Sequence, residues 1–126
     1  LDALLGLYSL PLSIHFDTGD IVLDSFPQVR DLLARHRTHL RDNNVRALNP
    51  MVGEIEFGLK KDRCRVMVIW ESVSPKGSLN TRADYFFKDS PSNPRIGMID
   101  FAMPVPQRFR KMTVDETADA LEWARD

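Results

Sequence analysis

The sequence predicts a single α+β domain in which helices cover one face of a curved antiparallel sheet. Apolar residues recur at helical spacing in two segments before residue 45, whereas from Met51 onward they occupy every second position. Turns rich in Gly, Pro and Ser separate these later runs, as is typical of consecutive antiparallel strands. The composition is 43% hydrophobic and 28% charged, which excludes a disordered chain.

A helix, a hairpin and a second helix are predicted to precede the sheet. Segment 1–10 has helical spacing, and Pro11 ends it because the residue before a proline is driven out of the α region. The strands LSIHF and IVL flank a DTGD turn in which Gly19 can adopt positive φ. The segment DSFPQVRDLLARHRTHLRDNNV predicts the main helix, with Ser25 as N-cap and Gln28 completing a capping box.

Four longer strands are predicted next, from the segments MVGEIEFGL, RCRVMVIWES, LNTRADYFFK and RIGMIDFAM. The second of these is apolar on both faces through its centre, so we expect it to be covered on both sides. A final helix with a thin apolar stripe is predicted in TVDETADALEWARD. The expected organisation is therefore one domain over residues 1–106 and a C-terminal helical extension over 107–126.

Composition limits the partners. A formal net charge of −1 lacks the basic excess that nucleic-acid binding needs, so no nucleic acid is expected. No apolar run approaches the roughly 20 residues of a membrane span, so no membrane partner is expected. The single cysteine, Cys64, allows no disulfide framework and indicates a reducing, cytoplasmic setting. A phosphate loop, a nucleophile elbow and the HExxH and CxxC motifs are absent from the sequence, so no cofactor is expected.

The order of elements, with the segments LDALLGLYSLPLSIHFD, SFPQVRDLLARHR and RVMVIWE…DYFFK…RIGMIDFAMP, resembles the nuclear transport factor 2-like superfamily, specifically its SnoaL-like branch. The resemblance covers residues 1–106 and rests on pattern and element order. It implies a cone-shaped, curved antiparallel sheet wrapped around helices, with a pocket between them and a homodimer formed through the outer sheet face. Fold analogy by itself transfers no function, since the superfamily includes both enzymes and binding domains.

The resemblance also implies a long helix ahead of residue 1. Because the sequence does not begin with Met, we expect this helix to be missing from the sequence as given, or to have been lost. One wall of the cone would then be bare unless the C-terminal helix or a second chain covers it.

Two residues are candidates for acid–base catalysis. Asp100 lies in the apolar strand GMIDFAMP, where the resemblance implies a polar residue facing the pocket, and burial would raise the pKa of its carboxyl. The alternative is a solvated strand-end acid or one paired with an arginine. His36 interrupts the apolar stripe of the main helix and could meet Asp100, although a hydrogen-bonded core or rim histidine is the commoner outcome.

Four further residues are predicted to line the pocket as ligand-binding groups. His15 could exchange a proton near pH 7, but alternation places it on the polar side of the hairpin, which favours a half-exposed structural residue. Tyr8, Trp70 and Tyr85 could offer hydrogen-bond donors to a ligand, or simply pack in the core. No metal site is expected, because His36 and His39 have no carboxylate at helical spacing to complete a ligand set.

Two functions are therefore predicted as alternatives. In the first, the domain binds a small apolar molecule and acts as a cofactor-free isomerase, dehydratase or cyclase by proton transfer, with Asp100 as acid or base. In the second, it is a noncatalytic dimeric ligand-sensing or protein-interaction module. Its function then depends on five residues of the outer sheet face: Arg65, Met67, Ile69, Arg82 and Phe86.

Overall fold

The computed structural model describes residues 2–58, 63–88 and 93–110. The predicted C-terminal helix over TVDETADALEWARD lies outside the described residues. The described elements are, in chain order, α1 (Asp2–Leu5), β1 (Tyr8–Phe16), β2 (Gly19–Leu23), α2 (Phe26–Asp42), β3 (Ala47–Phe57), β4 (Cys64–Ser74), β5 (Gly77–Lys88), β6 (Arg95–Asp100) and the 3-10 turn η1 (Gln107–Phe109). The predicted α+β class is confirmed. No described helix is long and apolar enough to cross a bilayer.

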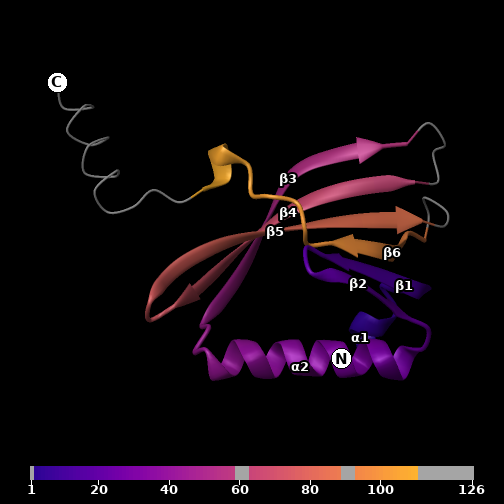
Figure 1. Ribbon diagram of the computed structural model, residues 1–126, viewed down its shortest axis with the longest axis horizontal. Coiled ribbons are helices and arrows are strands. Elements are labelled where there is room, and N and C mark those ends of the chain that lie inside the picture. Colours follow the sequence, from indigo (N-terminus) through magenta and orange to yellow (C-terminus); the bar gives the residue numbers. More distant parts are fainter. Residues whose placement is uncertain (1, 59–62, 89–92, 111–126) are drawn as a thin grey trace.

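The six strands form one curved sheet in the order β2-β1-β6-β5-β4-β3. Figure 1 shows α2 running along one side of this sheet, while β3, β4 and β5 extend away from it. Neighbouring strands are antiparallel except for β1 and β6, which are parallel. The parallel pair places the N-terminal hairpin beside the last strand and was not predicted.

The first helix ends earlier than predicted. It stops at Leu5, and β1 begins at Tyr8 instead of after Pro11. Pairing explains the difference, because Tyr8 is in register with Ile96 of β6 and the Ile96 N–H donates to the Leu7 carbonyl at 2.7 Å. Tertiary hydrogen bonds thus override the local helical spacing of this segment.

The main helix is built as predicted. Ser25 Oγ accepts from the Gln28 backbone N–H at 3.4 Å, and Gln28 Oε1 accepts from the Ser25 N–H at 3.2 Å, which completes the capping box. At the other end the helix finishes at Asp42, and Asn44 takes the left-handed conformation with φ 56°. The capped helix holds its apolar stripe against the sheet.

We call the sheet face that packs on α2 the concave face and the opposite one the convex face. The core lies between α2 and the concave face of β1, β5 and β6. Its centre is formed by six buried apolar side chains: Leu12, Ile14, Val29, Ala83, Ile96 and Ile99. Since directly paired residues of adjacent strands share a face, these core positions fix which face every paired residue occupies.

The chain's own segment 101–110 packs on the central part of the convex face of β3, β4 and β5. Met67 and Ile69 are each 1% exposed there. Asn80 Nδ2 donates to the Phe109 carbonyl at 2.6 Å, and Arg82 Nη1 donates to the Pro104 carbonyl at 3.0 Å. The two central apolar residues of the predicted dimer surface are therefore buried within one chain, and a homodimer formed through them stays a prediction.

Candidate functional site

Three aromatic side chains gather on the concave face, and we call them the aromatic cluster: Tyr8, Trp70 and Tyr85. Trp70 and Tyr85 are on the adjacent strands β4 and β5, and Tyr8 begins β1. The Trp70 Nε1–H donates to Tyr85 Oη at 3.0 Å. All three pack, half-buried, against the core cluster. The structure therefore brings together the three aromatic residues that the sequence predicted as ligand-binding.

The hydroxyl groups of the aromatic cluster are proton donors at neutral pH. Burial raises the pKa of Tyr8 above its usual value of 10. Burial also raises the pKa of Tyr85, although the hydrogen bond from Trp70 acts in the opposite direction. Because Tyr85 Oη accepts from Trp70, its own proton is free to be donated to a ligand oxygen.

The described strand positions of the concave face carry none of the usual acid–base groups. The pairing register places tyrosine, tryptophan, cysteine, small polar or apolar residues at its described strand positions, and no carboxylate, histidine, lysine or arginine. Cys64 is a half-buried free thiol on this face, in register with Phe57 and Phe87. The surface that the described part of the sheet offers to a ligand is therefore apolar and carries hydrogen-bond donors.

Asp100 lies on the convex face, contrary to the sequence prediction. It is in register with Asp84 and His15, whereas the preceding residue, Ile99, takes the buried concave position. Its Oδ1 accepts from the Ala102 N–H at 2.8 Å, so the carboxylate caps the turn that ends β6. The apolar run around Asp100 suggested burial, but strand alternation sends this side chain away from the pocket.

His36 does not meet Asp100. It is exposed on α2, whereas Asp100 is on the far side of the sheet, so the predicted acid–base pair is not formed. His15 is likewise exposed on the convex face, where its Nδ1 pairs with Asp20 of β2. This hydrogen bond raises the pKa of His15, and the nearby carboxylate of Asp100 adds to the effect. His15 therefore occupies the half-exposed hairpin position that the alternation favoured.

An ion network on the convex face was missed by the sequence reasoning. Asp84 is 2% exposed and accepts from Arg82 Nε at 2.7 Å, Arg82 Nη2 at 2.8 Å and Arg65 Nη1 at 3.0 Å. Arg65 Nη2 also donates to Glu54 and Glu56 on β3, at 2.7 and 2.9 Å. The signal available in the sequence was that Arg82 and Asp84 are two residues apart, which places them on the same face of a predicted strand.

Burial by itself would raise the pKa of the Asp84 carboxyl. The hydrogen bonds and positive charges of Arg82 and Arg65 outweigh burial and hold the pKa below its usual value. The network is thus ionised at neutral pH and ties β3, β4 and β5 together. It also connects the sheet to the 101–110 segment, because Arg82 Nη1 donates to the Pro104 carbonyl.

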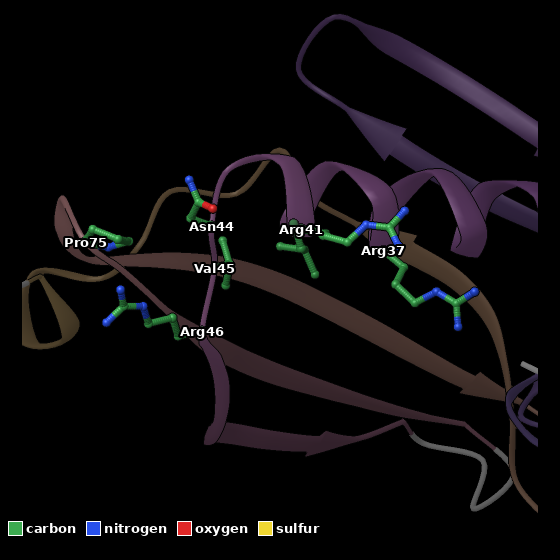
Figure 2. Close-up of a pocket in the computed structure, with 7 residues that line it drawn as sticks. Arg37, Arg41, Asn44, Val45, Arg46 and Pro75 are labelled. Atoms are coloured by element: carbon green, nitrogen blue, oxygen red, sulfur yellow. The ribbon is translucent and has the colours of Figure 1, made fainter.

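A hollow of about 480 Å³ lies where α2 ends, opposite the turn between β4 and β5 (Figure 2). It is lined by Arg37, Leu40, Arg41, Asn44, Val45, Arg46 and Pro75. A second hollow, of about 550 Å³, lies on the other flank of α2, where Asp31, Asp42, Arg35 and His39 give it mixed charge. Neither was predicted, because each is formed by tertiary arrangement. Among the described residues no group of three His, Cys, Asp or Glu is placed to hold a metal ion.

Solved structures of low sequence identity share this fold. A nuclear transport factor 2-like protein of unknown function from Shewanella oneidensis MR-1 superposes with a TM-score of 0.58 at 15% identity, covering 81% of this chain and 82% of that chain. One from Exiguobacterium sp. 255-15 gives 0.56 at 9% identity, covering 83% of both chains. The beta subunit of benzoate 1,2-dioxygenase from Burkholderia mallei ATCC 23344 gives 0.57 at 17% identity, covering 82% and 76%.

No protein-family model matches the sequence, and no curated protein matches it. The structural likeness extends over most of each chain at identities below 20%, so it concerns the fold alone. The SnoaL-like branch stays a prediction.

Proposed function

We propose that this chain, which has the nuclear transport factor 2-like fold, binds a small apolar molecule carrying a hydrogen-bond acceptor. The observation that carries the proposal is the Trp70–Tyr85 hydrogen bond on an apolar concave face, at 3.0 Å. It orients Tyr85 so that its proton is available to a carbonyl or ether oxygen of the ligand. The apolar residues around it supply burial for the rest of the molecule.

Binding is a better account of this face than proton-transfer catalysis. An isomerase, dehydratase or cyclase needs a base that titrates near neutral pH. The described concave strand positions provide only tyrosines with raised pKa values and Cys64. Asp100, the predicted base, is on the convex face. We therefore propose a binding role, with the aromatic cluster as the ligand contact.

The test is binding of Nile red, a neutral apolar dye with a carbonyl acceptor. We expect Tyr85→Phe to weaken binding about fivefold, because one hydrogen bond is worth roughly 1 kcal/mol. In ¹⁵N NMR spectra, the Trp70 indole signal should shift on titration with the dye, its assignment being given by Trp70→Phe.

Asp100→Asn is the matched control, since it lies on the opposite face and should bind the dye as the parent chain does. If Asp100→Asn weakens binding and Tyr85→Phe does not, the concave-face proposal is wrong. An unmoved Trp70 signal at saturating dye would also refute it.

A second candidate is docking of a protein segment on the concave side of β3. Three apolar side chains of β3 are exposed there: Val52 at 57%, Ile55 at 54% and Phe57 at 72%. Single exposed apolar residues are common on protein surfaces, whereas a group of them on one face is typical of an interaction site. The pairing of Ile55 with Val66 and of Phe57 with Cys64 extends this apolar area onto β4. One solved structure of this fold is a subunit of a larger enzyme, which is consistent with such a role.

Self-association provides the test of this second candidate. Ile55→Glu should reduce the sedimentation coefficient of any oligomer to that of one chain, because a buried unpaired carboxylate would oppose docking. Val22→Glu, on the convex side of β2 and 53% exposed, is the matched control and should have no effect. A single-chain species at all concentrations would leave small-molecule binding as the better proposal.

A further inference from the structure

The hollow at the end of α2 contains positive charge, and no described acid lines it. Among the residues that the structure describes, its ionisable lining residues are Arg37, Arg41 and Arg46. Figure 2 shows the guanidinium groups of Arg37 and Arg41 extending to the same side, and that of Arg46 to the opposite side. Two of the three guanidinium groups thus lie on one side of the hollow.

These arginines differ from the arginines of the convex face. Arg65 and Arg82 are held by carboxylates, whereas the side chains of Arg37, Arg41 and Arg46 make no hydrogen bond or ion pair with another described residue. The acids of α2 are on its other flank, where Asp31 and Asp42 line the second hollow. Among the described lining residues, the flank with Arg37 and Arg41 therefore carries positive charge alone, whereas the other flank has both acids together with Arg35.

The arrangement of Arg37 and Arg41 has a cost for the helix. They are one turn apart, and like charges at this spacing repel each other. A position near the helix C-terminus favours one cation there, but it does not relieve the repulsion between the two. A bound anion would relieve it, and the planar guanidinium group is suited to carboxylate or phosphate oxygens.

The hollow is within reach of the aromatic cluster. Arg46 immediately precedes β3, and its N–H donates to the Val73 carbonyl at 2.7 Å. Trp70 is in register with Pro50, four residues further along β3. At roughly 3.3 Å per residue, about 13 Å of sheet separates the two levels. An elongated molecule on the aromatic cluster can therefore extend along the sheet to the level of Arg46, which lines the same hollow as Arg37 and Arg41.

From this juxtaposition we infer that the ligand is an elongated amphiphile with an anionic end, a carboxylate or a phosphate. Arg37 and Arg41 bind the anion, Arg46 adds positive potential, and the apolar body lies along the concave face toward Trp70. The inference rests on the proposed function and names the ligand class for the same face.

Calorimetric titration of the full chain tests this with three probes that share a ten-carbon chain: decanoate and decyl phosphate below their micellar concentrations, and 1-decanol below its solubility limit. Decanoate or decyl phosphate should bind at least about tenfold more tightly than 1-decanol, since hydrogen bonds to charged groups are the stronger ones. The preferred anion identifies the headgroup.

Arg41→Gln and Arg37→Gln should each weaken anion binding about tenfold and leave 1-decanol binding unchanged. Arg35→Gln is the matched control, because it removes the same charge from the other flank of α2 and should leave anion binding unchanged.

Equal affinity for all three probes would overturn the inference while the proposed function stands. An equal loss in Arg35→Gln would also overturn it, because the effect would then be one of net charge. If no probe binds and the Trp70 indole signal does not respond to Nile red, the proposed function fails and the inference fails with it.

Discussion

Replacing Asp84 by alanine should lower the free energy of unfolding by about 3 kcal/mol, because two arginines would be left without their shared carboxylate. The loss of one partner of a buried ion pair costs 3–5 kcal/mol. We expect the low end of this range because the Arg65 side chain is 19% exposed and retains Glu54 and Glu56. The decrease should be measured by urea unfolding at pH 7.

Glu56→Ala is the control for this prediction. Its side chain is 66% exposed, so its ion pair with Arg65 should contribute only about 0.5 kcal/mol. If both variants lose a similar free energy of unfolding, the buried Asp84 contributes no more to stability than the exposed Glu56.

The Asp84 carboxylate should also make the free energy of unfolding depend on pH in the acid range. Its pKa in the folded chain is below the ordinary value of 3.8, so the folded state favours the ionised form. Its contribution is therefore complete above the unfolded pKa and is lost as pH falls through the folded pKa. The stability difference between the parent chain and Asp84→Asn should shrink over this acid range and stay constant above pH 6.

Local signals in the sequence are sufficient to predict the helical and strand content. The capping box at Ser25 and Gln28 predicts the start of α2 because a cap is made within four residues. Alternation from Met51 onward likewise predicts strands, although pairing extends β3 back to Ala47. These features depend on near neighbours in the chain.

The candidate site was less predictable, because it depends on which strands become neighbours. Tyr8 joins Trp70 and Tyr85 only through the parallel pairing of β1 with β6, and periodicity contains no information about this pairing. Asp100 shows a different difficulty. Its apolar neighbours indicated burial, but a shift of one residue sends a strand side chain to the opposite face. Irregular register between Phe86 and Phe87 makes such parity hard to count from sequence.

Gly53→Leu should lower the free energy of unfolding by about 2 kcal/mol and displace segment 101–110 from the convex face. Even a Cβ at Gly53 would collide with the Met67 Cε and lie 3.1 Å from the Phe109 ring. Overpacking of this kind costs 1–3 kcal/mol. Because Asn80 Nδ2 donates to the Phe109 carbonyl, the Asn80 side-chain amide signal in NMR spectra should report the displacement.

The neighbouring position provides a control, since Val52 is 57% exposed on the concave face and Val52→Leu should change neither stability nor the Asn80 signal. A second variant separates local crowding from a general defect. Met67→Ala should cost less in the Gly53→Leu background than in the parent chain, because it removes the atoms that collide. Additive costs, with an unchanged Asn80 signal, would show that Phe109 and Met67 do not pack over Gly53 in solution. The convex face would then be exposed, and Met67 and Ile69 would be accessible at the centre of the dimer surface that the sequence predicts there.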